Sequence, residues 1–271
     1  MQKTRHSFLF ISLLALSLPL FSQFNTYSPY TRFGLGDLAK NGFAQNLAMG
    51  GTGIAIHEND RLNYLNPAAA ASLDSTSVYF DFGANAFFNE YRTDQISNTW
   101  WNMNLHHVAF GTSMGKYLGF VAGIVPYSSI GYNIKQEYND LQIGQAMDTY
   151  YQGDGGTLNF FSGLALKLFD RLSVGVTMNY LMGRLTRERE VNFPMNSSYS
   201  SISALENFDL RKPVFSLGLQ YRQDLGEKFF FSLGGVYDFK ATIGTELNYE
   251  VINRFYPYDS ISLSSGEVIK P

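Results

Sequence analysis

The chain has 271 residues, of which 16% are aromatic and none is Cys, and its formal net charge is -3. The negative charge argues against a nucleic-acid partner and against a polybasic membrane anchor. Because no disulfide framework is available, stability must come from packing and backbone hydrogen bonding.

The chain opens with a pattern typical of a secretory signal peptide. A short basic start precedes the apolar run from Phe8 to Phe21, and the small residue Ser22 follows it. The run is shorter than the ~20 residues that a membrane-spanning helix needs. A buried core helix is the alternative. We predict that residues 1–22 are removed and that the mature protein lies outside the cytoplasm.

Residues 23–74 are Gly-rich and not strand-like, and they contain one short helix signal. Asn66 can cap a helix, Pro67 suits the first helical position, and Ala68 to Ala71 are strong helix formers. Asp74 stops the run early, although isolated helices shorter than ~12–15 residues are marginal in water. The backbone N–H and C=O groups of such an irregular segment need hydrogen-bond partners, and the lumen of a wide barrel can supply them. We therefore predict an irregular, short-helical plug inside a barrel wall, where larger side chains would not fit.

From Ser75 onward the dominant period is two, which indicates β-strands. In "VYFDFGANAFF", for example, Phe80 and Phe82 alternate with Tyr79 and Asp81. Each run is long enough to cross a membrane, since a tilted spanning strand takes ~9–11 residues. The mean hydropathy of -0.12 allows this, because lipid-facing and lumen-facing residues alternate in such strands. About seven runs are predicted, at 78–88, 105–115, 117–132, 157–169, 171–183, 213–223 and 228–242.

The predicted connections alternate between tight turns and long polar loops. Short turns on one side and long loops on the other are the pattern of outer-membrane barrels. A secreted β-sandwich is the alternative, but it would not explain strands of this length. The predicted fold is all-β, an antiparallel transmembrane β-barrel whose strands lie within residues 75–271. The long loops are expected at 89–104, 133–156 and 184–212.

The segment "GLGDLAKNGFAQNLAMGGTGIAIHENDRLNYLNPAAAASLD" resembles the N-terminal plug of FadL-type outer-membrane transporters of hydrophobic compounds. "YSPYTRFGLGD" and "PYSSIGY" are similar to the Bacteroidetes branch of that family. The resemblance implies the outer membrane of a Gram-negative cell, plug-gated entry of fatty-acid-like molecules, and their lateral release into membrane lipid. The positions that match the family's Gly-rich turn and Asn-Pro-Ala motif are Gly50, Gly51, Gly53, Asn66, Pro67 and Ala68.

The chain departs from that family in strand number. The family's barrel has fourteen strands, whereas about seven are predicted here. A weak eighth strand at 260–269 would allow an eight-stranded barrel, but its interior is wide enough only for its own side chains. A plug of roughly fifty residues would not fit there. We therefore expect an incomplete copy of a larger barrel.

Pro126 lies inside the third predicted strand, in "GFVAGIVPYSSIGY". Proline has no N–H for a sheet ladder, so it indicates a point where this strand parts from a neighbour. FadL-type transporters are similar in having a kinked third strand that opens the wall. Gly123, Pro126 and Ser128 are therefore the candidate lateral opening. Alternatively, the strand ends near Val125 and Pro126 opens a loop.

The sequence gives no support for an enzyme, a metal or a cofactor. "MGGTGIAIH" lacks the spacing of a phosphate-binding loop, and no Ser, His and acidic residues are placed as a triad. The adjacent His106 and His107 are expected to point to opposite faces of a strand, so they cannot share a metal. The turn from His57 to Asp60 offers a weak calcium site at most. The charged run from Arg184 to Glu190 is expected to form a solvated helix.

Two functions stay open. One is an outer-membrane barrel that admits hydrophobic small molecules. The other is a non-transporting barrel that serves as a scaffold or shuttle in protein secretion, with partners that the sequence does not name. A transporter needs a continuous apolar pocket, whereas a scaffold can have a polar, filled interior. The first is the function that the sequence predicts, and the second is the alternative. The predicted inward residues count somewhat against the first, because they are polar or small: Asp81, Asn85, Thr157, Asn159, Thr177 and Asn179.

Overall fold

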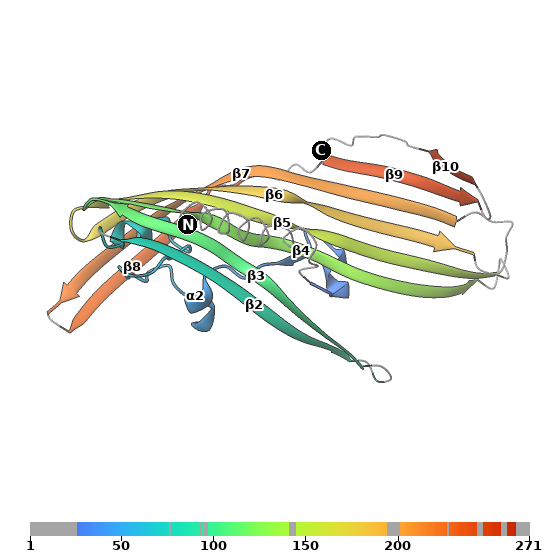
Figure 1. The fold of residues 1–271 in the computed structure, drawn as a ribbon, viewed down its shortest axis with the longest axis horizontal. Coiled ribbons are helices and arrows are strands. Elements are labelled where there is room, and N and C mark those ends of the chain that lie inside the picture. Colours follow the sequence, from blue (N-terminus) through green and yellow to red (C-terminus); the bar gives the residue numbers. More distant parts are fainter. Residues whose placement is uncertain are drawn as a thin grey trace, which may run out of the picture.

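The protein folds as an open antiparallel half-barrel sheet with the N-terminal segment laid along one face (Figure 1). In the described part of the chain, no helix is long and apolar enough to span a membrane. The predicted signal peptide, 1–22, lies outside the described residues. The computed structural model describes residues 26–75, 77–92, 94, 97–140, 145–193, 201–226, 228–242, 246–255 and 259–263.

The described residues form a ten-stranded sheet, in which seven consecutive strands pair each with the next one in the sequence. The seven strands predicted from the period-two pattern are therefore confirmed. Tight turns join β3 to β4, β5 to β6 and β7 to β8, within one or two residues of their predicted positions. The strands are β2 (Val78–Arg92), β3 (Ser97–Met114), β4 (Leu118–Asp140), β5 (Gln145–Leu168), β6 (Leu172–Asn192), β7 (Ser201–Leu225) and β8 (Phe229–Asp238).

The long loops predicted between the other strands are wrong over most of their length. Residues 133–140, 145–156 and 184–192 continue β4, β5 and β6 as paired strands. Polar side chains occur on both faces there, and the few apolar ones, such as Tyr151 and Leu185, are too far apart to give the alternation that indicates a strand. The predicted helix from Arg184 to Glu190 is wrong for the same reason. Arg184 instead donates two hydrogen bonds across the sheet to Asp209, at 2.7 and 3.0 Å.

The C-terminal partner of β7 is divided into two pieces. β8 pairs with residues 216–225 of β7, and β9 (Glu246–Phe255) pairs with residues 201–209. β10 (Asp259–Leu263) pairs with β9, so the predicted strand at 260–269 is correct only for its first residues. Residues 264–269 lie outside the described part. β9 was missed although Leu247, Tyr249 and Val251 alternate with polar residues.

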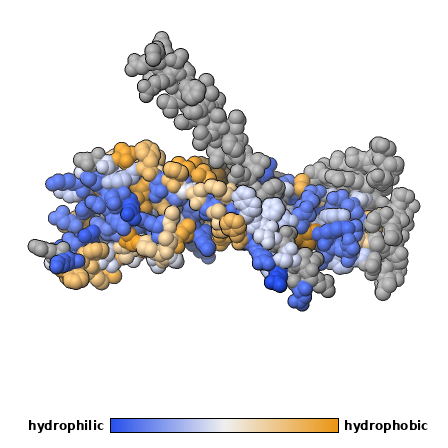
Figure 2. All heavy atoms as spheres, turned by 60° about the horizontal axis from the view of Figure 1, so that its bottom comes forward, coloured by the Kyte–Doolittle hydropathy of each residue, from blue (hydrophilic) through white to orange (hydrophobic). Residues whose placement is uncertain are grey.

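The outer face of the sheet carries a band of exposed apolar side chains. The band covers the half of the sheet that ends in the three tight turns, which we call the turn half (Figure 2). Apolar rows cross neighbouring strands there, as in Phe82, Val108, Ile124 and Phe160. The other half, the hairpin half, carries polar and charged side chains on this face.

The N-terminal segment and the inner face of the sheet enclose the apolar core. The main cluster joins Phe43, Leu62 and Leu73 of the segment to Val121 and Phe161 of the sheet. A smaller cluster in the hairpin half contains Ile130, Tyr132, Tyr151 and Leu185. The short elements of the segment are η2 (Pro29–Arg32), β1 (Asp37–Leu38), α2 (Ala44–Ala48) and η3 (Pro67–Ser72).

Candidate functional site

The predicted short helix is η3, a 3-10 helix in which all six residues are buried. The side chain of Asn66 accepts a hydrogen bond from the backbone N–H of Ala68 at 2.9 Å, which caps the helix as predicted. Pro67 occupies the first turn, and Ala68 is fully buried. The Asn-Pro-Ala motif therefore starts a buried helix that touches the sheet along its length.

Three glycines of the sheet explain why this helix is made of small residues. A Cβ atom added to Gly119 would lie 1.9 Å from the carbonyl oxygen of Ala70. A Cβ on Gly175 would lie 2.4 Å from the carbonyl carbon of Pro67, and one on Gly218 would lie 2.2 Å from Oδ1 of Asn66. The helix backbone thus lies directly on β4, β6 and β7. Neither side has room for a larger side chain.

Asn66 joins three parts of the molecule. Its Nδ2 donates to the carbonyl oxygen of Ile54 at 2.7 Å and to that of Leu219 on β7 at 3.0 Å. The side chain is fully buried, and its oxygen is already used by the helix cap. One amide group therefore fixes the Gly-rich loop, the start of η3 and the sheet relative to one another.

The three predicted glycines of the Gly-rich turn have different surroundings. Gly50 and Gly51 have φ angles of 75° and 84°, which favour glycine, and both face open space. Gly53 is buried, and a Cβ there would lie 2.2 Å from Nδ2 of Asn46. Asn46 also accepts a hydrogen bond from the N–H of Phe43, which begins α2. Of the three, only Gly53 is therefore packed, against Asn46 and Leu65; Gly50 and Gly51 form the exposed turn.

A chain of polar side chains crosses the inner face of the turn half. Asn159 donates to the hydroxyl of Tyr64 at 2.8 Å and to Oδ1 of Asn179 at 2.9 Å. Asn179 donates to Ser216 at 3.2 Å, and Ser216 donates to Asp238 at 2.5 Å. Burial raises the pKa of Tyr64 to about 12, so its hydroxyl stays neutral. The inner face of the turn half is therefore filled, by this polar chain and by the apolar core cluster beside it.

The three residues of the predicted lateral opening lie where β4 leaves β3. The last β3–β4 pair is Val108 with Ile124, and residues 97–107 of β3 pair only with β2. The register between β4 and β5 shifts between Pro126 and Ser128, which is a position where proline is tolerated. The alternative that the strand ends near Val125 is wrong, because β4 continues to Asp140.

The side chains at this point are packed rather than open. A Cβ on Gly123 would lie 2.6 Å from the carbonyl oxygen of Val108. Ser128 is 1% exposed, and its hydroxyl lies 2.7 Å from that of Thr157. The structure thus brings Gly123, Pro126 and Ser128 together at a split between two strands. Whether molecules pass there remains a prediction.

A comparison with family models decides which family this half-barrel belongs to. The model described as BamG matches residues 3–263, nearly the whole chain. The chain belongs to the BamG family. BamG is associated with outer-membrane β-barrels, so this BamG chain is an outer-membrane barrel-related protein. No curated protein and no solved structure matches it significantly. The FadL-type resemblance and a hydrophobic ligand stay predictions.

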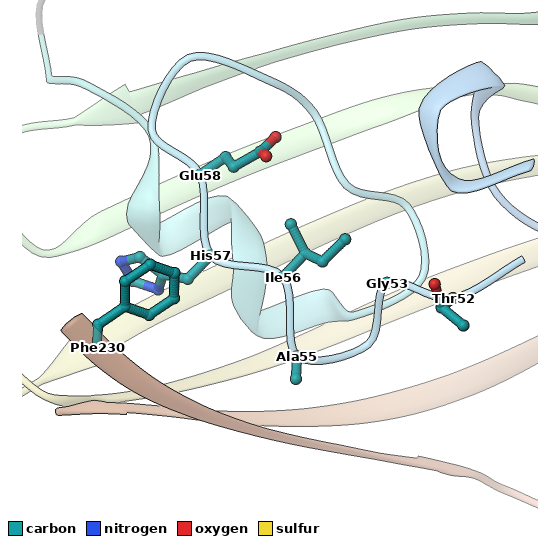
Figure 3. Close-up of a pocket in the computed structure, with 7 residues that line it drawn as sticks. All are labelled: Thr52, Gly53, Ala55, Ile56, His57, Glu58 and Phe230. Atoms are coloured by element: carbon teal, nitrogen blue, oxygen red, sulfur yellow. The ribbon is translucent and has the colours of Figure 1, made fainter. Parts of the chain in front are cut away.

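A hollow of about 390 Å³ borders the Gly-rich loop of this BamG chain (Figure 3). His57 and Phe230 lie on one side of it, and Nδ1 of His57 is 2.9 Å from the hydroxyl of Ser72. Burial, and then the nearby Arg222 guanidinium, lower the pKa of His57, so the ring is neutral at pH 7. The hollow is open to solvent. Glu58 also lines it, and Figure 3 shows its carboxylate directed away from the His57 ring, so these side chains do not have the geometry of a catalytic triad with Ser72.

The prediction that His106 and His107 point to opposite faces is wrong. The β2–β3 register shifts between Gly83 and Ala84, which leaves His106 out of the ladder as a bulge. Both rings are buried, and their Nδ1 atoms lie 2.9 Å apart. His107 stacks on Phe43 with ring centroids 4.1 Å apart and lies 3.1 Å from Asp81. Within the described residues of this BamG chain, no group of three or more acidic, His or Cys side chains is arranged to hold a metal.

Proposed function

We propose that this BamG protein spans the outer membrane as part of a barrel with a filled interior, and that it serves as a scaffold for other envelope proteins. Transport of small molecules is the second candidate. The observation that carries the proposal is the backbone contact between η3 and Gly119, Gly175 and Gly218. A segment held at this distance cannot move aside without separating from three strands at once.

The outer face supports the placement in a membrane. Phe80 and Phe82 of β2 are 80% and 78% exposed, and similar apolar side chains continue across the turn half. An exposed apolar surface of this extent is unfavourable in water, and in lipid it is solvated. The polar hairpin half would then project from the membrane, as the loops of outer-membrane barrels do.

The inner face supports a scaffold over a transporter. A site for an apolar ligand is a mostly apolar cavity, and a transport path must connect such cavities. Here the inner face of the turn half carries the hydrogen-bonded chain from Tyr64 to Asp238, and Asn66 binds β7 across the same region. Breaking each buried hydrogen bond without a new partner costs about 1–3 kcal/mol, which opposes an open path on this side.

The experiment is a comparison of bound lipid and of membrane composition. The full-length protein is purified from its own membranes, extracted with organic solvent and examined by mass spectrometry beside an unrelated barrel from the same membranes. We expect no enriched apolar ligand. In a deletion strain we expect lower amounts of specific outer-membrane proteins, restored by the parent gene. A stoichiometric apolar ligand, with an unchanged outer-membrane proteome, would overturn the proposal.

The second candidate, uptake of hydrophobic molecules with lateral release, is favoured by the split between β3 and β4 at Ile124. If molecules leave there, Pro126→Val is expected to reduce uptake of a labelled long-chain fatty acid, because an added N–H can extend the ladder. The amount of folded barrel should not change. Uptake equal to that of the parent at equal abundance would remove this candidate.

A further inference from the structure

The split between β3 and β4 leaves two strand edges facing each other in the hairpin half. Within the described residues, β3 has no β4 partner before Val108, and β4 has no β3 partner beyond Ile124. Figure 1 shows β2 and β3 diverging from β4 in this region, with the N-terminal segment beside the gap. Unpaired backbone groups on such edges bind other strands readily unless something covers them.

The residues from Thr26 to Lys40, which we call the strap, cover the β4 edge. β1 pairs with β4 at Asp37 with Ser129 and at Leu38 with Ser128. The N–H of Ala39 donates to the carbonyl oxygen of Tyr127 at 2.9 Å, and that of Ser28 donates to Gly131 at 2.7 Å. The strap therefore adds a short strand to the edge that β3 leaves free.

The strap also contacts the opposite side of the split. The ring of Tyr27 stacks on that of Trp100 in β3, with centroids 4.7 Å apart. The hydroxyl of Tyr91 in β2 donates to the carbonyl oxygen of Tyr27 at 2.7 Å. The bulged His106 forms a hydrogen bond with the backbone of Lys40. The strap thus joins β4 to β2 and β3 across the gap.

The strap is held by backbone bonds and a few side chains rather than by a buried apolar face. Three of its large apolar side chains, Tyr30, Phe33 and Leu38, are 77%, 74% and 63% exposed. Its strand contributes only two residue pairs to the sheet. Segments with few buried apolar contacts open locally at low free-energy cost. By contrast, η3 is buried over its whole length.

We propose that the strap is a releasable closure of the β3–β4 split, distinct from the fixed contact between η3 and the sheet. In the closed state Leu35 and Gly36 cover Ile130 of β4. Release of the strap exposes Ile130 and the β4 edge while η3 stays in place. This inference does not depend on whether the protein is a scaffold or a transporter.

The test uses the absence of cysteine from the chain. Ile130→Cys places a thiol beneath the strap, and Val121→Cys places one on the same strand beneath the rest of the N-terminal segment. Labelling by a water-soluble maleimide is followed in the purified full-length protein. Trp100→Ala removes the ring that stacks on Tyr27, and Trp101→Ala, a 67% exposed neighbour, is the matched control. Tyr91→Phe removes only the hydrogen bond to Tyr27.

We expect Trp100→Ala to accelerate labelling of Ile130→Cys roughly twofold to tenfold, as the loss of one aromatic pair predicts. Tyr91→Phe should act in the same direction, and Trp101→Ala should have no effect. Labelling of Val121→Cys should stay slow in every background. Equal labelling of Ile130→Cys in all backgrounds, or equal acceleration at both thiols, would overturn the proposal.

Discussion

At the scale of residues, Asn66 has more structural consequences than its position in a short motif indicates. A helix cap needs only the side-chain oxygen, and that role was predicted from the sequence. The amide nitrogen adds bonds to Ile54 and to Leu219, which lies 153 residues further along the chain. Replacement by Ser would keep the cap and lose both of these bonds, so the residue's identity reflects the tertiary structure.

Removing this amide should loosen the N-terminal segment without preventing assembly. We expect Asn66→Ala with Pro67→Ala to increase the leak of small antibiotics through the full-length protein, since a cap of ~1 kcal/mol and two further buried bonds are lost. Growth inhibition and the amount of barrel in the membrane are measured together. Asn41→Ala, at an exposed position, is the control. Normal permeability at normal abundance would mean that Asn66 holds no barrier.

A second prediction concerns the glycines that contact η3. Gly175→Val should destabilise the contact by ~1–3 kcal/mol or more, because the new side chain meets the backbone of Pro67 and Ala68 rather than a movable side chain. Gly235→Val is the matched control, because nothing lies within 4 Å of a Cβ there. In the full-length protein, the temperature at which the folded band disappears on gels should fall for the first variant only. Equal temperatures would show that η3 can shift away.

At the scale of elements, the short strand β1 is the least expected feature. Residues 23–74 were predicted to be free of strands, and two residues give no detectable alternation. The pairing exists because β4 leaves β3 at Ile124 and its edge needs partners. β1 therefore forms because β3 and β4 diverge, and the local sequence of the strap does not predict it.

The register of β1 can be tested by a disulfide. Directly opposed residues in an antiparallel pair have Cβ atoms about 4.5–5.5 Å apart, close to the separation that a disulfide needs. We expect Leu38→Cys with Ser128→Cys to cross-link under mild oxidation, detected as a gel shift reversed by reductant. Leu38→Cys with Ile124→Cys, four residues away on β4, should not cross-link. Failure of the first pair in a folded protein would contradict the register.

At the scale of the whole molecule, the half-barrel has open strand edges, and lipid offers no hydrogen-bond partners to the unpaired backbone groups on them. Within the described residues, β2 pairs on one side only, and β8 pairs only with β7. Unpaired backbone groups in hydrocarbon cost several kcal/mol each, so spanning sheets are closed. If the sheet spans a membrane, as we propose, its open edges must pair with further strands, whatever their source.

The open edges lead to a prediction for the 271-residue chain expressed alone. We expect no heat-modifiable, protease-resistant barrel, because β2 and β8 would both present open edges to lipid. The check is electrophoresis of boiled and unboiled membrane samples, with an unrelated outer-membrane barrel as the positive control. A band that migrates faster unboiled than boiled would show that this chain closes a barrel by itself.

The sequence by itself determined the features that depend on local pattern. Period-two alternation identified seven strands, the tight turns followed from their spacing, and Asn66 with Pro67 identified the start of η3. Pro126 indicated, from its missing N–H, a point where β4 parts from a neighbour, and the last β3–β4 pair lies two residues before it, at Ile124.

Only the tertiary structure decided the features that depend on distant partners. The polar ends of the hairpins are strands because facing residues such as Arg184 and Asp209 pair, which no single segment reveals. The inward position of His106 follows from a bulge in β3, where the register with β2 shifts. The strap pairs with β4 where β3 no longer does, beyond Ile124. In each case the deciding bond joins residues far apart in sequence, so the local pattern carries no trace of it.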